Sequence, residues 1–173
     1  MERKTSSNAF LALRALAFVF LLPGTFAVYA PLQILRATGR LLPPSFSVSS
    51  LAASVLLLAG AAVVLRCVWD FFAAGRGTLA PVDPPKRLVV AGLYRFTRNP
   101  MYNGVLAAIL GEAWLFRAPV LLFYAFCVLT GFHLFVVLYE ERTLAGRFGH
   151  EYASYRRRVP RWGFVIRPEP GEL

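Results

Sequence analysis

Four long apolar runs constrain the fold of this chain more than any other feature of its sequence. The runs are Ala15–Leu35, Leu51–Ala74, Met101–Phe116 and Val120–Tyr139. A helix that crosses a bilayer needs about 17–25 mostly apolar residues and satisfies its backbone hydrogen bonds internally. The third run is short by this measure, so it must borrow Pro100 or Arg117 at its edges, or cross a thinned region lined by protein. We therefore expect an all-α integral membrane protein with about four transmembrane helices.

The composition points the same way. Hydrophobic residues make up 57% of the 173 residues and charged residues only 16%. A soluble domain usually contains about 25% charged residues. The composition therefore argues against a soluble protein, and the length suffices for one domain.

The first apolar run permits a second interpretation. Glu2-Arg3-Lys4 and an apolar stretch that ends near Val28-Tyr29-Ala30 also match a cleaved signal peptide. Against cleavage, Arg14 interrupts the start of the run, the run continues to Leu35, and Pro31 would directly follow the cleavage site. We favour an uncleaved transmembrane helix.

The net charge of +10 is unevenly distributed. With a cytoplasmic N-terminus and four spans, the C-terminus is also cytoplasmic, and the outer loops hold only Arg36, Arg40 and Arg117. The opposite orientation would violate the positive-inside rule. Because the cations flank the spans, we expect them to attract anionic membrane lipids, at about 1 kcal/mol each, and expect no nucleic-acid partner. The Ala/Leu/Arg-rich composition favours a multi-pass protein of a prokaryotic inner membrane.

The runs divide the chain into four segments. We expect two N-terminal transmembrane helices, a cytoplasmic loop, a transmembrane hairpin and a cytoplasmic C-terminal helical segment, at residues 1–74, 75–100, 101–141 and 142–173. The loop contains four prolines, too many for one long helix, and loops of this length tend to be functional. Since only Arg117-Ala118-Pro119 separates the last two runs, they must form an antiparallel hairpin. The hairpin places Arg98–Tyr102 and Tyr139–Arg142 on one membrane face.

Two adjacent acids end the last apolar run. A helix C-terminus disfavours the carboxylates of Glu140 and Glu141 by about 0.3–1 kcal/mol, and acids at a membrane border are scarce unless they are paired. They are either an ordinary helix end, with Arg142 as partner, or part of a site.

The motif RNPMY also has two interpretations. Asn99 is a favoured N-cap and Pro100 a favoured first helical residue, while Arg98 and Tyr102 are typical of a membrane interface. The same helix start, with exposed N–H groups and a guanidinium, binds carboxylates or phosphates. Together with the opposing acids, it would complement a zwitterionic ligand that carries a ribose.

Other polar residues give weaker signals. Glu112 lies inside an apolar run and is a functional candidate, or a partner of Arg66 or Arg14. His133 is expected to be a hydrogen-bonded residue of the bundle. Neither the cysteines nor the histidines show the spacing of metal ligands, so we expect no metal site.

The second half of the chain resembles the membrane-integral methyltransferases. The resemblance rests on three elements in this order: AGLYRFTRNPMYNG, an apolar hairpin and EERTLAGRFGHEYASYRRRVPRW. These methyltransferases comprise isoprenylcysteine carboxyl methyltransferases and phospholipid N-methyltransferases, and the resemblance covers about Gly75 to Trp162. It implies S-adenosylmethionine as methyl donor, bound on the cytoplasmic side between the hairpin and the C-terminal segment. It also implies a lipophilic acceptor or lipid substrate that enters from the bilayer: a phospholipid amine, an isoprenoid or fatty carboxylate, or a thiol. We expect no obligate protein partner.

The resemblance assigns roles by position. The positions that match cofactor-binding ones are Arg98, Asn99, Pro100, Tyr102, Gly104, Glu140, Glu141, Tyr94, Tyr152 and Tyr155, and Pro160 matches the C-terminal pattern. As a hypothesis, Arg98 holds the donor carboxylate, Glu141 holds the donor's amine or ribose, and Glu140 faces the acceptor. The catalytic candidates are Arg98 and Glu140. Carboxyl methyltransferases usually have histidine where Asn99 stands, so NPMY is closer to the phospholipid enzymes.

Two other functions compete with methyl transfer. Sterol reductases resemble the C-terminal architecture and use NADPH, whose extra phosphate could bind Arg156–Arg158, although such reductases are much longer. The third interpretation is a non-catalytic membrane adaptor in which the acids and arginines form surface ion pairs.

Overall fold

The structure is a computed structural model that describes residues 23–42, 45–73, 88 and 90–165. The elements in chain order are η1 (Thr25–Tyr29), α2 (Ala30–Ala37), α3 (Val48–Ala73), η2 (Gly92–Arg95), α4 (Pro100–Leu115), α5 (Pro119–Phe135), η3 (Val136–Glu140) and α6 (Glu141–Arg158). All secondary structure in the described residues is helical, which confirms the predicted all-α class. Of the first predicted span, Ala15–Leu35, the part before Pro23 lies outside the described residues, as do residues 74–87 and 166–173.

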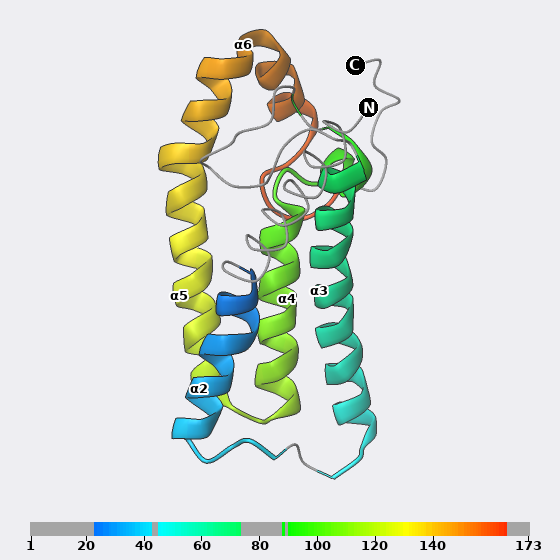
Figure 1. Cartoon of the computed structure of the whole chain (residues 1–173), viewed down its shortest axis with the longest axis vertical. Coiled ribbons are helices and arrows are strands. Elements are labelled where there is room, and N and C mark those ends of the chain that lie inside the picture. The colour runs from blue at the N-terminus through cyan, green and yellow to red at the C-terminus, as the bar shows by residue number, and fades with distance from the viewer. Residues whose placement is uncertain (1–22, 43–44, 74–87, 89, 166–173) are drawn as a thin grey trace, which may run out of the picture.

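Three helices, α3, α4 and α5, run side by side along the length of the molecule, and α2 is a shorter helix packed beside them (Figure 1). The turn Phe116–Ala118 joins α4 to α5, with Arg117 at a φ of 48°, so the predicted antiparallel hairpin is confirmed. Beyond α5 the helix continues through η3 into α6, which projects past the end of α4.

Two helical segments are long and apolar enough to cross a membrane, Val48–Asp70 and Pro119–Arg158. Only 17% and 22% of their most apolar windows are buried, so these side chains face outward rather than into a protein core. Outward-facing Leu58, Phe123 and Phe126 are typical of lipid contact. The count of four spans stays a prediction. Helix α4 has only 16 residues, and the first predicted span is only partly described.

The second of these segments is longer than a bilayer requires. As one straight helix its 40 residues would extend about 60 Å at about 1.5 Å per residue, against roughly 30 Å for a hydrocarbon core, but the segment bends at Gly149. Its apolar part ends at Tyr139, and polar and charged residues become frequent from Glu140 onward.

Small residues let α3 and α4 approach closely. A Cβ on Gly60 would lie 2.6 Å from the backbone oxygen of Gly104, and one on Gly111 would lie 2.6 Å from the backbone nitrogen of Leu57. Helices in membranes pack through such small residues because their backbones can then make contact. This packing fixes the position of α4, whose first turn carries RNPMY.

The chain after α6 returns to the start of α4. Helix α6 bends at Gly149, whose φ of 46° and ψ of −116° are not helical. The following residues 159–165, here called the strap, run back from α6 toward the beginning of α4 (Figure 1). Backbone N–H groups of Arg98 and Val165 donate to the carbonyls of Pro160 and Phe96, at 2.9 and 3.0 Å. The strap thus lies across the end of the hairpin.

Candidate functional site

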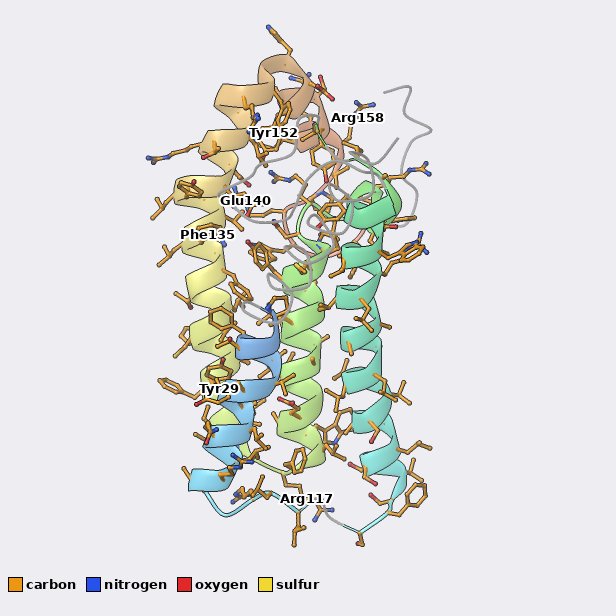
Figure 2. All side chains as sticks on the ribbon, viewed as in Figure 1. Tyr29, Arg117, Phe135, Glu140, Tyr152 and Arg158 are labelled. Atoms are coloured by element: carbon orange, nitrogen blue, oxygen red, sulfur yellow. The ribbon has the colours of Figure 1, made fainter. Side chains whose placement is uncertain are left out.

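The hairpin brings RNPMY and the acid pair together at the end of the bundle opposite the α4–α5 turn. Arg98 Nη1 donates to Glu141 Oε1 at 2.8 Å, and the Tyr102 hydroxyl donates to Glu140 Oε2 at 3.2 Å. Figure 2 shows Glu140 partway along the long α5–η3–α6 helix, in the upper half of the view, and Arg117 at the lower end of the molecule. The two segments lie together at one end of the bundle, as the hairpin predicted; which membrane face this end occupies stays a prediction.

The two acids have different surroundings although they are adjacent in sequence. Glu140 is the last residue of η3, a wider π-helical turn, and Glu141 begins α6. Such turns often occur at functional sites because they shift the register of the side chains that follow. Here Glu140 contacts Tyr102 of α4, whereas Glu141 contacts arginines.

Glu141 is the centre of a buried ion triad. Besides Arg98, it binds Arg161 of the strap, whose Nε and Nη2 donate to Oε1 and Oε2 at 2.6 and 3.0 Å. The side chains of Glu141 and Arg98 are only 8% and 10% exposed, so water screens the Arg98–Glu141 pair little. Tyr152 of α6 accepts a further bond from Arg98 Nη1, at 3.2 Å.

These surroundings move the pKa values of the two acids in opposite directions. Burial alone would raise the pKa of Glu141, but the hydrogen bond from Arg161 and the charges of Arg98 and Arg161 outweigh it, so this pKa is lowered. Burial raises the pKa of Glu140, and the charge of Glu141 adds to this, against the hydrogen bond from Tyr102. At neutral pH Glu141 is therefore firmly ionised, and Glu140 holds a proton more readily than an ordinary glutamate.

A small cavity, partly open to solvent, lies between the hairpin and α6; its empty space, including the solvent-open part, is about 230 Å³. Its lining residues are Arg98, Asn99, Val136, Glu140, Glu141, Leu144, Tyr152 and Tyr155. Six of the ten residues predicted to bind the cofactor are among them. Tyr155 is held by donating to the Tyr94 carbonyl at 2.7 Å.

The structure places the other four predicted residues around the cavity rather than in its lining. Tyr102 reaches the site through Glu140, and Pro100 begins α4. Gly104 packs against α3, where a Cβ would lie 2.9 Å from the carbonyl of Gly60. Tyr94 is buried in the core cluster with Cys67 and Val105.

Asn99 occupies the predicted N-cap position of α4, but the predicted capping bond is wrong. Its side chain makes no cap hydrogen bond, and Nδ2 instead donates to the Arg161 carbonyl at 3.1 Å. The residue is thus used to hold the strap, because a partner far along the chain replaces the local one.

Arg161 and Trp162 are site residues that the sequence prediction missed. Trp162 Nε1 donates to His133 Nδ1 of α5 at 3.1 Å, and the Trp162 ring lies 6.5 Å from that of Tyr102. The hydrogen bond expected for His133 is present, with the strap as its partner. The only sequence signal was the motif RVPRW, in which Pro160 alone was noted.

The remaining polar candidates do not join the site. Arg66 pairs with Asp70 at 2.9 Å rather than with Glu112, and Arg14 lies outside the described residues. Glu112 Oε2 is buried without a hydrogen-bond partner in the part of the chain that the structure describes. Within that part, no three His, Cys, Asp or Glu side chains gather in a way that could hold a metal ion.

One buried hydrogen-bond donor of a cavity residue has no acceptor. Arg98 Nε is buried and, within residues 23–42, 45–73, 88 and 90–165, has no hydrogen-bond acceptor. A buried unpaired donor is costly, and a guanidinium is well suited to a carboxylate.

The two long apolar helices with outward-facing side chains indicate an integral membrane protein, and the acid–arginine cluster is its candidate functional site. Comparison with known families identifies the group. The sequence profile described as phospholipid methyltransferase matches residues 48–151, more than half of the chain. The chain belongs to this family.

One curated relative gives a more specific likeness. Over 78 residues the chain is 37% identical to methanethiol S-methyltransferase 1 from Bradyrhizobium diazoefficiens. The aligned region covers 43% of this chain and 25% of that protein, so the chain spans about a quarter of the relative's length. No solved structure matches the chain with statistical significance.

Proposed function

We propose that this protein is an S-adenosylmethionine-dependent methyltransferase that acts on a lipophilic acceptor at the cytoplasmic face of the membrane. The family membership supports methyl transfer. The observation that carries the rest of the proposal is the cavity at the hairpin end, where Arg98 offers a buried free donor and Glu140 a carboxylate.

When bound, the donor's sulfonium would supply an electrophilic methyl group for an in-line displacement. The protein's own contribution is then positioning and the exclusion of water. Arg98 Nε, which is buried and has no acceptor among the described residues, would hold the donor's carboxylate. The strap would help to exclude water, because its Arg161 bonds to Glu141 and Asn99, two residues that line the cavity.

Glu140 faces the acceptor in this proposal. An amine or thiol acceptor must lose a proton to become a good nucleophile, and a buried carboxylate with a raised pKa is a better proton acceptor than an ordinary one. Tyr102 holds the Glu140 carboxylate by its hydrogen bond.

Two acceptor classes have support. The phospholipid methyltransferase family favours a lipid amine that reaches Glu140 from the bilayer. The likeness to a methanethiol S-methyltransferase favours a small thiol as the second candidate. Either acceptor would donate its proton to Glu140 and take the methyl group.

The test uses the protein purified in detergent. It is incubated with methyl-labelled S-adenosylmethionine and a total lipid extract, and separately with methanethiol, and the labelled products are identified. Label in a lipid or in a methyl sulfide supports the proposal, and Glu140→Gln should abolish most of it. Label in neither product would contradict methyl transfer to these acceptors.

A thermal-shift comparison separates the donor from a reductase cofactor. S-adenosylhomocysteine should raise the melting temperature and NADPH should not. Stabilisation by NADPH alone would favour a membrane reductase, and stabilisation by neither would favour a non-catalytic adaptor.

A further inference from the structure

We infer that Arg161 is a positioning residue that locks the strap over the cavity by pairing with Glu141, so that Glu141 acts through the strap and does not itself hold the methyl donor. The inference rests on the proposed function and assigns the roles of the two acids within it. It replaces the hypothesis that Glu141 binds the donor's amine or ribose.

The bonding of Glu141 leaves it little capacity for a ligand. Both of its oxygens accept bonds from Arg161, and Oε1 also accepts one from Arg98. Removing one partner of a buried charge pair is strongly unfavourable, so an incoming ammonium would have to displace a bidentate guanidinium. Within the described residues, Tyr102 is the hydrogen-bond partner of Glu140, which leaves that carboxylate available to a ligand.

The backbone on either side of Arg161 is fixed. The carbonyls of Pro160 and Arg161 accept bonds from the Arg98 backbone and the Asn99 side chain, and Val165 is bonded to Phe96. These bonds attach the strap to the segment before α4. Arg161 therefore cannot leave Glu141 by a small movement of the main chain.

Two side chains of the strap contact the α5–α6 helix. Arg161 binds Glu141 at the start of α6, and Trp162 binds His133 of α5. The strap thus connects the segment before α4 to the α5–α6 helix. Because Arg98 and Asn99 both line the cavity and bond to the strap, the position of the strap sets the position of the donor-binding groups.

The two roles of Glu141 predict opposite effects of one substitution. If Arg161 only competes with the donor for Glu141, Arg161→Gln frees Glu141 and S-adenosylhomocysteine binds more tightly. If Arg161 locks the strap, the same change weakens binding, by about tenfold for the loss of charge-assisted hydrogen bonds. Arg161→Lys keeps the charge but not the bidentate geometry, so it should restore only part of the affinity.

The experiment measures calorimetric affinity for S-adenosylhomocysteine and hydrogen exchange of the amides of Arg98 and Val165 in the full chain. Arg161→Gln and Glu141→Gln should both accelerate exchange and raise the donor KM, with kcat at saturation within about threefold of wild type. Glu140→Gln should leave the exchange unchanged and lower kcat. The matched control is Arg157→Gln, an exposed arginine of α6 that bonds to Ser154 and should change neither readout.

Three outcomes would overturn the inference. Arg161→Gln could bind S-adenosylhomocysteine more tightly than wild type, or Glu141→Gln could bind it more weakly while amide exchange stays unchanged. The third outcome is that Arg161→Lys restores none of the affinity. Failure of the wild-type protein to bind S-adenosylhomocysteine would instead overturn the proposed function. The exchange data would still decide whether Arg161 and Glu141 lock the strap.

Discussion

Arg98 and Glu141 are 43 positions apart in the sequence, and their side chains form a hydrogen-bonded ion pair of 2.8 Å at the polar end of the helical hairpin. The pair joins the start of α4 to the start of α6. Arg98 Nε has no hydrogen-bond acceptor among the described residues. Arg98 and Glu140 both line the cavity.

Substitution of Arg98 should therefore weaken ligand binding. Arg98→Ala removes the proposed carboxylate contact, and a bond to a charged group contributes about 1.5–3 kcal/mol, so affinity for S-adenosylhomocysteine should fall roughly 10- to 100-fold. Titration calorimetry of the purified protein measures this. Arg95→Ala, at an exposed arginine in η2, is the control and should bind normally. Equal affinities for Arg98→Ala and wild type would exclude Arg98 from the donor site.

The bend in α6 should depend on glycine at position 149. Its φ of 46° and ψ of −116° are strained for any residue with a Cβ, although nothing lies within 4 Å of the place a Cβ would take. Gly149→Ala should therefore destabilise the protein by about 1–3 kcal/mol through backbone strain alone. Gly146→Ala, in the regular part of α6 with equal space, should be neutral or slightly stabilising. Melting temperatures in detergent test the pair, and equal effects at both positions would contradict the explanation.

The contact between α3 and α4 should not tolerate a side chain at Gly60. An added Cβ would lie 2.6 Å from backbone atoms of Gly104 and Ala108, which cannot turn away as a side chain can. Gly60→Ala should cost about 1–3 kcal/mol or more and reduce the yield of folded protein. Gly131→Ala on α5 has no neighbour within 4 Å and serves as control. Size-exclusion profiles and thermal unfolding measure both, and normal behaviour of Gly60→Ala would show that the helices are farther apart.

The ion triad should make stability depend on pH in the acid range. The pKa of Glu141 is lower in the folded protein than in the unfolded chain, so the carboxylate contributes stability above the unfolded value of about 4.3. That contribution is lost as the pH falls through the folded pKa. The difference in melting temperature between wild type and Glu141→Gln should thus be largest near neutral pH and disappear in acid. A difference that stays constant down to about pH 3 would mean that Glu141 is not the group responsible.

The sequence by itself determined the helices and their connection. The apolar runs predicted α3, α4 and α5 to within a few residues, because spanning segments have to be long, apolar and helical. Arg117-Ala118-Pro119 is too short for anything but an antiparallel hairpin, and that hairpin placed RNPMY beside Glu140-Glu141. Proline at the first helical position likewise marked the start of α4.

Only the tertiary structure decided which side chains meet. Asn99 fits its local role as an N-cap, yet its side chain bonds to Arg161, 62 positions away. Gly104 lies within the cofactor motif but packs against α3. Glu141 is paired with Arg98 and Arg161, while its neighbour Glu140 faces the cavity. Local signals record helix starts and apolar faces. They do not predict the bend at Gly149 or the return of the strap to the start of α4. Those two features determine which charged groups pair.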